Sequence, residues 1–182
     1  MPEELRGDLP VEPKNNREAQ ALPEWEHWQR AEEVEMQGLI NNGVWTQVKR
    51  PNNNLVMSMM MLYKRKIGED GNVEKYKCRL VAHGNRQIKG VHFQEASSPA
   101  LAVASTKRML SLAAIKTWEL RHVDFERAYL QAPIDQEIFK IPVEYWEFPE
   151  SVRRLDKAIY GLVQAGRCWS MKITTDLTAK GF

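Results

Sequence analysis

The feature that most constrains the fold of this chain is the dipeptide Asp70-Gly71, which stands between two segments with the composition of β-strands. A two-residue type I′ turn needs positive φ at both central positions, and Asp-Gly is one of the preferred pairs there. The turn therefore predicts a β-hairpin. Its register contains two cross-strand lysine pairs, Lys64 with Lys77 and Lys66 with Lys75.

The second predicted strand of this hairpin, Val73–Ala82, alternates apolar and basic side chains. Its apolar face carries Tyr76, Cys78, Leu80 and Ala82, and its basic face carries Lys75, Lys77 and Arg79. Like charges directly opposite each other destabilise a sheet, so the basic face indicates an anionic partner, for which phosphates are the obvious candidate. The alternative is a solvated edge hairpin whose lysines prevent edge-to-edge aggregation.

The first half of the chain predicts a mixture of helix and strand. Residues 1–22 lack apolar periodicity and are expected to form a disordered linker. A helix is predicted between Pro23 and Gly43, with a packed stripe of Trp25, Trp28, Met36, Leu39 and Ile40. A strand at Trp45–Val48, a turn at Asn52–Asn54 and an apolar run at Leu55–Tyr63 follow. The run is expected to fill the core with Met57, Met59, Met60 and Met61.

The second half continues this mixture, so the predicted fold class is α+β. Ser105 is expected to cap a helix over Thr106–Lys116 that faces inward through Met109, Leu112 and Ala113. An apolar strand, Glu119–Phe125, is predicted next and brings the carboxylate of Asp124 to its end. A last helix, Ala165–Lys180, is expected to pack through Trp169, Ile173 and Leu177 and to end at Gly181.

Composition excludes several classes of protein. The formal net charge of +2 is too small to indicate nucleic-acid binding unless the charges cluster on one face. The two cysteines, Cys78 and Cys168, have no CxxC spacing, so neither a zinc knuckle nor a disulfide framework is indicated. No secretory signal and no run of about 18 apolar residues occurs, so an intracellular protein without a membrane span is expected.

Five blocks of the chain resemble, in order and spacing, the reverse transcriptase of copia-type retrotransposons. They are WQRAEEVEMQGLINNGVWTQV (Trp28–Val48), YKRK…KYKCRLVAHG (Tyr63–Gly84), the block with Gln87, Gly90, Phe93 and Ser98-Pro99, HVDFERAYLQAPIDQEIF (His122–Phe139) and LDKAIYGLVQAGRCW (Leu155–Trp169). The resemblance covers about 24–182 and implies the fingers and the beginning of the palm of a right-hand polymerase. Residues 23–100 would form the fingers with the basic hairpin, and 101–182 a partial palm with a returning fingers segment.

The resemblance also implies a site for two-metal nucleotide addition. Asp124 matches the first ligand of the catalytic Mg²⁺ or Mn²⁺, and Tyr129 matches the ring that lies beneath the incoming sugar and excludes a ribose 2′-hydroxyl. The implied phosphate contacts are Lys77, Arg79 and Lys64, and the implied lining of the nucleotide and template pocket is Tyr160, Gly161 and Gln164. The implied partners of the parent enzyme are an RNA or DNA template-primer, dNTPs and the rest of the retrotransposon polyprotein, and the parent element would be found in cytoplasmic virus-like particles or the nucleus.

Some residues depart from the family pattern. Glu126 and Arg127 replace a basic and a small polar residue, and Val163 and Gly166 replace a lysine and a proline. The family's second catalytic block, Y-x-D-D, is expected beyond Phe182, and no Asp-Asp pair occurs in the 182 residues.

Three interpretations follow from these departures. The first is an N-terminal reverse transcriptase fragment that is inactive as this chain alone. The second is a non-catalytic nucleic-acid-binding remnant or co-opted module that uses the basic hairpin. The third is a non-functional translated fragment that aggregates through exposed apolar edges. A hydrolase is disfavoured because no nucleophile turn accompanies His122 and Asp124.

Overall fold

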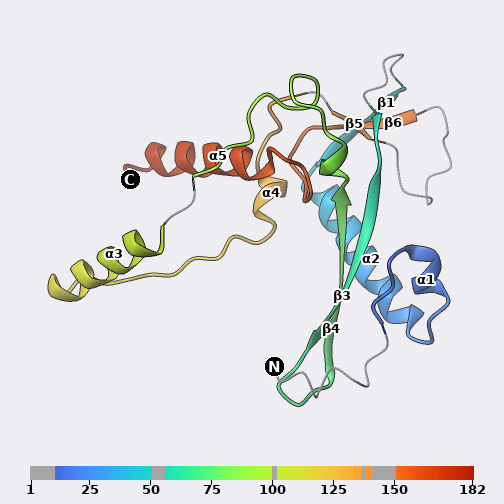
Figure 1. The fold of residues 1–182 in the computed structure, drawn as a ribbon, viewed down its shortest axis with the longest axis horizontal. Coiled ribbons are helices and arrows are strands. Elements are labelled where there is room, and N and C mark those ends of the chain that lie inside the picture. The colour runs from blue at the N-terminus through green and yellow to red at the C-terminus, as the bar shows by residue number, and fades with distance from the viewer. Residues whose placement is uncertain (1–10, 51–55, 100–101, 137, 141–150) are drawn as a thin grey trace.

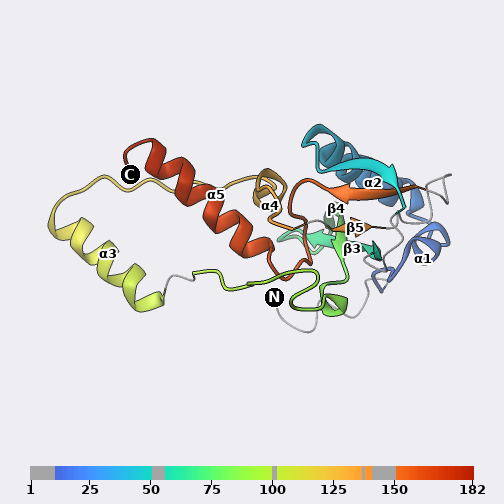
Figure 2. The same cartoon turned by 90° about the horizontal axis from the view of Figure 1, so that it is seen from above.

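A computed structural model describes residues 11–50, 56–99, 102–136, 138–140 and 151–182. A long hairpin runs beside one long helix, and a small sheet lies at one end of the pair (Figure 1). A second long helix leads away from this body, and a third helix stands apart from it, as two perpendicular views agree (Figures 1 and 2). The chain therefore mixes helices and strands, which confirms the predicted α+β class.

The helix predicted after Pro23 is α2, Trp25–Asn41. It ends where Gly43 adopts a φ of 57°. The amide of Val44 donates to the carbonyl of Leu39 at 3.2 Å, and that of Gly43 donates to Ile40 at 2.9 Å, which together form a Schellman motif. Trp28 and Leu39 are buried as predicted, but Ile40 is 52% exposed and does not belong to the packed stripe.

The segment before α2 differs from the disordered linker that we expected. Residues 16–20 form a short helix, α1 (Asn16–Gln20), whose N-terminus is capped by Asn15 accepting from the amide of Glu18 at 2.9 Å. Asn16 Nδ2 donates to Glu32 Oε1 at 2.9 Å, and Ala19 is fully buried. These contacts attach residues 11–22 to α2, while residues 1–10 of the expected linker lie outside the described residues.

The hairpin consists of β3 (Met59–Ile67) and β4 (Val73–Ala82). Its register pairs Lys64 with Lys77 and Lys66 with Lys75, as predicted. The turn itself is not type I′, because within it only Gly71 has a positive φ. The amide of Gly68 donates to Asn72 at 2.9 Å around a longer loop, and a bulge beside Lys66 restores the predicted register.

A four-stranded sheet lies at the other end of the hairpin, in the order β1-β6-β5-β2. The strand predicted at Trp45–Val48 is β1 (Trp45–Lys49), and it pairs antiparallel with β6 (Ser151–Leu155). The short strand β5 (Phe139–Lys140) pairs antiparallel with β6 and parallel with β2 (Val56–Met57). The predicted turn at Asn52–Asn54 lies outside the described residues.

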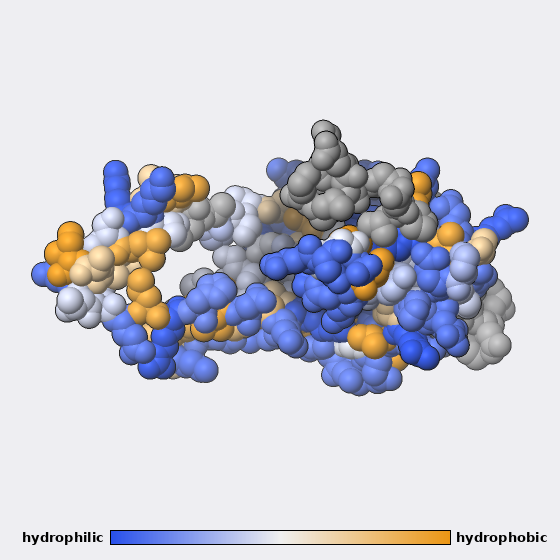
Figure 3. Space-filling view, turned by 90° about the horizontal axis from the view of Figure 1, so that it is seen from below, coloured by the Kyte–Doolittle hydropathy of each residue, from blue (hydrophilic) through white to orange (hydrophobic). Residues whose placement is uncertain are grey.

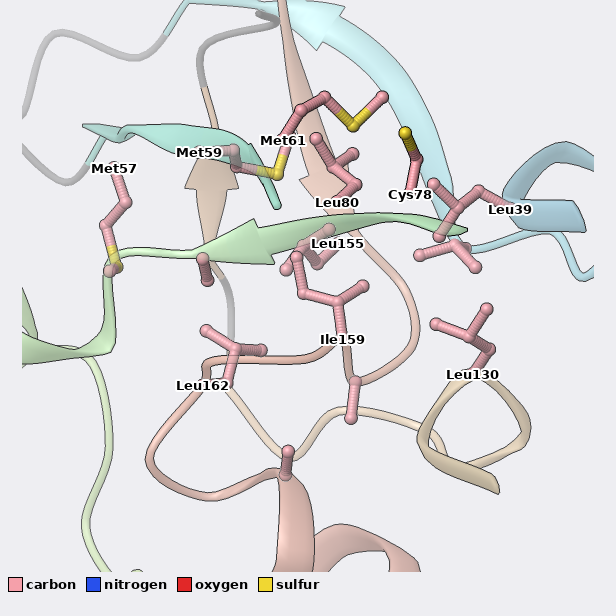
Figure 4. Packing of buried hydrophobic residues seen from close by; sticks show 14 of the residues in the cluster. Leu39, Met57, Met59, Met61, Cys78, Leu80, Leu130, Leu155, Ile159 and Leu162 are labelled. Atoms are coloured by element: carbon pink, nitrogen blue, oxygen red, sulfur yellow. The ribbon is translucent and has the colours of Figure 1, made fainter. Parts of the chain in front are cut away.

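The core lies between α2, the hairpin and the segment that follows β6. Figure 4 shows Met59 and Met61 of β3 close to Leu80 of β4 and Leu155 of β6. Met57, Met59 and Met61 are buried, which confirms them as core residues, whereas Met60 is half-buried because successive strand residues face opposite sides. Leu130, on the short helix α4 (Ala128–Gln131), joins the same cluster.

The region around the third helix, α3 (Val103–Ile115), corrects three predictions. Ser105 does not cap this helix, because the N-cap is Ala102. Met109 and Leu112 are exposed rather than inward, although Ala113 is buried. Residues 119–125 form no strand in the structure, because no described strand pairs with them.

These residues leave apolar side chains on the surface. The exposed set on α3 and the segment after it includes Val103, Met109, Leu110, Leu112, Ile115, Trp118, Leu120, Val123 and Phe125. Orange, apolar side chains gather at the end of the molecule that α3 forms (Figure 3).

The last helix, α5, spans Ala165–Ala179, and Gly181 follows it with a φ of 86°. It buries Ala165 and Cys168, and Trp169 packs partly against the core. Leu177, which we expected on the packed side, is exposed.

The contrast between two neighbouring residues of α2 provides a test of this packing. Leu39→Ala removes a fully buried side chain and is expected to lower the free energy of unfolding by roughly 2–5 kcal/mol. Ile40→Ala, at a half-exposed position, is the matched control and is expected to cost under about 1 kcal/mol. Urea denaturation followed by circular dichroism measures both, and equal losses would contradict the described packing of α2.

Candidate nucleic-acid interface

The basic hairpin face is present in the structure as the alternation predicts. Lys64, Lys66, Lys75, Lys77 and Arg79 are all exposed, while Cys78 and Leu80 on the opposite face of β4 are buried. The two cross-strand lysine pairs place four ammonium groups on one surface of a twisted ribbon. Of these five residues, only Lys66 forms an ion pair with a carboxylate of the hairpin itself, because its Nζ lies 2.7 Å from Oε2 of Glu74.

The N-terminal segment partly neutralises this face. The carboxylate of Glu12 forms an ion pair with Lys64 and accepts a hydrogen bond from the backbone amide of Arg65 at 2.9 Å. Burial by itself would raise the pKa of Glu12, but the hydrogen bonds from Lys64 and Arg65 lower it below its ordinary value. Lys64 is therefore engaged by the chain itself, whereas Lys77 has no carboxylate partner among the residues that the structure describes.

Arg79, Tyr160 and Tyr129 form a contiguous cluster at the end of the hairpin nearest the small sheet. The guanidinium carbon of Arg79 lies 5.0 Å from the centre of the Tyr160 ring, within cation–π range. The Tyr129 and Tyr160 rings meet edge to face at 5.3 Å. Burial is the main reason why the pKa of Tyr160 is raised, so its hydroxyl is neutral at physiological pH. Three residues predicted from separate blocks thus meet in one place.

Gly161 is the residue that allows this cluster to form. It has a φ of 85°, and a Cβ there would lie 2.3 Å from the carbonyl oxygen of Ala82. The preceding carbonyl, that of Tyr160, accepts from the amide of Ala82 at 2.8 Å. The backbone of Gly84 also approaches Gly161 closely, because a Cβ added at Gly84 would lie 2.0 Å from the carbonyl oxygen of Gly161. The backbone at Gly161 therefore lies directly against the end of β4 and the residues that follow it.

Gln164 lies inside the protein and does not line an open pocket. It is fully buried, its Oε1 accepts from Gln87 Nε2 at 2.9 Å, and its Nε2 donates to the carbonyl of His92 at 3.1 Å. Gln87 Oε1 in turn accepts from the amide of Val163 at 2.7 Å. This pair of glutamines holds the 160–164 turn against residues 87–92. The sequence indicated Gln87 only as part of a spacing pattern, and its role required the fold.

Asp124 is exposed, and its carboxylate makes no hydrogen bond or ion pair with any residue that the structure describes. Its neighbour Phe125 packs edge to face on Trp169 of α5 at 5.1 Å, which anchors the segment beside α5. A hard carboxylate oxygen is the donor that Mg²⁺ prefers. Among the described residues, however, no group of three or more His, Cys, Asp or Glu side chains converges, so Asp124 supplies one ligand without companions.

Two further residues at this end of the molecule have contacts that the sequence did not predict, although Arg127 was noted there as a departure from the family pattern. Arg127 follows Asp124 by three positions and makes contacts with α2, and Glu35 of α2 accepts from the backbone amide of Leu80 in β4 at 3.2 Å. Neither has a motif of its own in the sequence.

A row of cationic side chains on a hairpin, continuous with an arginine and two tyrosines, is the kind of surface used by proteins that bind nucleic-acid backbones and bases. The comparisons with known proteins specify this class. The family model described as reverse transcriptase (RNA-dependent DNA polymerase) matches residues 42–182, and the chain belongs to this family.

Its relatives confirm the copia-type resemblance. The chain is 32% identical over 161 residues to the retrovirus-related Pol polyprotein from transposon RE2 of Arabidopsis thaliana, covering 86% of this chain and 11% of that protein. It is 32% identical over 174 residues to the Pol polyprotein from transposon TNT 1-94 of Nicotiana tabacum, covering 94% of this chain and 13% of that protein. It is 30% identical over 114 residues to the Ty1-BL Gag-Pol polyprotein of Saccharomyces cerevisiae, covering 63% of this chain and 6% of that protein.

The chain thus corresponds to a small part of each of these polyproteins. No solved structure matches it. In the part of the chain that the structure describes, no helix has the length and apolar character needed to cross a bilayer.

The close approach at Gly161 leads to a prediction with a matched control. Gly161→Ala combines an unfavourable positive φ with a collision against the backbone of Ala82, whereas Gly90→Ala has the same φ of 85° in open space. Gly90→Ala is expected to cost about 1 kcal/mol of stability, and Gly161→Ala at least about 2 kcal/mol more. Chemical denaturation measures both, and equal costs would show that residues 160–161 do not approach β4.

The contact of Glu12 with the hairpin leads to a pH prediction. Because the pKa of Glu12 is lowered in the folded chain, this contact stabilises the fold at neutral pH and is lost as the pH falls through the folded-state pKa. The carboxyl ¹³C signal of Glu12 is expected to titrate below its ordinary value of 4.5. In the Lys64→Gln variant the midpoint is expected to rise towards that value, and an unchanged midpoint would contradict the ion pair.

Proposed function

We propose that this chain forms the fingers and the beginning of the palm of a retrotransposon reverse transcriptase, and that by itself it binds a template-primer without extending it. Residues 23–100 are the fingers with the basic hairpin, and residues 101–182 are a partial palm with a returning fingers segment. The observation that carries this proposal is the continuity between the basic hairpin face and the Arg79–Tyr160–Tyr129 cluster.

The proposed contacts follow from chemistry and position. Lys77 and Arg79 bind phosphate oxygens through charge-assisted hydrogen bonds. Lys64 joins them once it leaves Glu12. Tyr129 lies beneath the incoming sugar, where its ring excludes a ribose 2′-hydroxyl, and Tyr160 and Gly161 form the adjacent wall. Gln164 supports this wall from inside through Gln87.

The family's metal chemistry is incomplete in the described residues. Asp124 is the proposed ligand for Mg²⁺ or Mn²⁺, which would stabilise charge on the reacting phosphate. One exposed carboxylate is a weak site for such an ion, and the described residues contribute no converging group of ligands. For this reason we expect no nucleotide addition by these 182 residues alone.

The proposed partners are an RNA or DNA template-primer, dNTPs and the remaining parts of a Pol polyprotein, and the parent element is proposed to act inside cytoplasmic particles or the nucleus. The alternative function is a non-catalytic nucleic-acid-binding module that uses the basic hairpin alone. The exposed lysine pairs support both functions, whereas the junction of Arg79 with Tyr160 and Tyr129 supports the polymerase-derived one.

Binding to an RNA–DNA hybrid tests the basic face. The double variant Lys75→Glu with Lys77→Glu is expected to weaken binding at least about tenfold near 0.1 M salt and to reduce the slope of log K against log salt by about 2. Lys107→Glu with Lys116→Glu, two exposed positions on and after α3, changes net charge equally and serves as the control. Fluorescence anisotropy measures both, and equal weakening would reject the hairpin as the interface.

Two further measurements distinguish the proposed functions. If the hairpin acts alone, Tyr160→Ala leaves the affinity for the hybrid unchanged, whereas the polymerase-derived site predicts a loss. Primer extension with Mg²⁺ or Mn²⁺ is expected to give no product from the 182-residue chain. Incorporation that disappears in Asp124→Asn would overturn the proposed inactivity while supporting the polymerase site.

A further inference from the structure

Arg127 occupies an unusual backbone position and makes contacts far from it in the sequence. It is the residue before α4 and has a φ of 52°, in the left-handed region that L-residues with a side chain rarely adopt. Its Nη2 donates to the carbonyl of Val34 at 3.2 Å, and its Nη1 donates to the carbonyl of Glu35 at 3.4 Å. Nη1 also lies 3.5 Å from the Glu35 carboxylate.

Gly38 makes this contact with α2 possible. A side chain on a helix covers the turn that precedes its own Cα, so a residue at position 38 would cover the carbonyls of Val34 and Glu35. A Cβ at Gly38 would lie 1.4 Å from Nη1 of Arg127. Glycine is unfavourable inside a helix. Gly38 therefore costs α2 some helix stability, but it leaves the space that the guanidinium of Arg127 occupies.

Glu35 links the same guanidinium to the hairpin. Its side chain is almost fully buried, and its Oε1 accepts from the backbone amide of Leu80 in β4 at 3.2 Å. Burial raises the pKa of Glu35, and the charges of Arg127 and Arg79 and the Leu80 hydrogen bond oppose that rise. The carboxylate thus contacts β4 on one side and Arg127 on the other.

The chain around Arg127 carries the proposed functional residues. Asp124 precedes it by three positions and Tyr129 follows it by two. The carbonyl of Arg127 accepts from the amide of Leu130 at 2.8 Å, and the side chain of Leu130 is fully buried. Residues 124–130 are therefore held to the rest of the protein by the guanidinium of Arg127 on α2, by the buried side chain of Leu130 and by the contact of Phe125 with Trp169.

We infer that Arg127, Glu35 and Gly38 form a latch that fixes the segment carrying Asp124 and Tyr129 relative to α2 and β4, with Arg127 acting as a positioning residue. Arginine is needed because its planar fork contacts two carbonyls and a carboxylate at once, which a lysine ammonium does not reproduce. The benefit to nucleotide binding rests on the function proposed above. The latch itself rests only on the contacts described.

Amide hydrogen exchange on the full chain tests the latch. Gly38→Ala expels the guanidinium while favouring the helix, and Arg127→Lys keeps the charge but loses the fork. Among residues 124–131 the amide of Leu130 donates to the carbonyl of Arg127, and both variants are expected to speed exchange of this protected amide at least about tenfold, as loss of charge-assisted hydrogen bonds predicts. In Gly38→Ala exchange within α2 is expected to slow. Gly166→Ala, a glycine replacement in α5 with only ordinary contacts near 3.4 Å, is the matched control and leaves residues 124–131 unchanged.

A functional readout separates positioning from general loosening. The affinities for fluorescent dATP and ATP are measured with a template-primer present. If Arg127→Lys displaces Tyr129, the ratio of the dATP affinity to the ATP affinity is expected to fall. A merely structural loss would lower both affinities by the same factor.

The outcomes are distinct. Unchanged amide exchange at residues 124–131 in both variants would overturn the latch. Faster exchange together with a lower dATP-to-ATP affinity ratio would support it. An unchanged dATP-to-ATP ratio despite faster exchange would overturn the positioning role. If the unmodified chain binds neither nucleotide, the proposed nucleotide site fails, and the exchange data alone decide the latch.

Discussion

The packing of α2 against one face of the β3–β4 hairpin is the interaction on which the rest of this structure depends. Trp28 of α2 lies edge-on to Tyr63 at 5.5 Å and to Tyr76 at 4.6 Å, and Arg65 lies over its ring at 5.2 Å. Because strand side chains alternate, burial of this face sends the lysines and Arg79 to the opposite face. The candidate interface is therefore a direct consequence of the core.

Buried carboxylates on α2 decide what attaches to this unit. Glu32 accepts from Tyr63 and Asn16, which holds α1 in place, and Glu35 accepts from Leu80 and contacts Arg127. A buried charge is costly without partners, so each carboxylate favours the arrangement in which its partners are present. The N-terminal segment and the segment bearing Asp124 are joined to α2 through such groups.

Residues 119–125, which follow α3, have no neighbouring strand among the described residues. A single strand is not stable without a neighbour to satisfy its backbone groups, and residues 119–125 remain extended without pairing. The apolar side chains that would pack around a paired strand, such as Leu120 and Val123, are exposed. The matched Pol polyproteins extend far beyond the region shared with this chain. Under the palm assignment that we propose for residues 101–182, residues 119–125 would join a sheet.

Local patterns in the sequence determined the strongly periodic elements and much of the interface. The extent of α2 and the basic face followed from periodicity and from Gly43, because these depend on neighbours within a few residues. The predicted lysine register was also correct, but a longer loop and a bulge produce it instead of the expected type I′ turn. The motifs also indicated Tyr129, Tyr160 and Gly161. Only the tertiary structure decided that Gln164 is buried against Gln87, that residues 11–22 pack on α2 and that Arg127 reaches Gly38. These arrangements join residues from about 15 to more than 90 positions apart, and such contacts depend on how the elements pack.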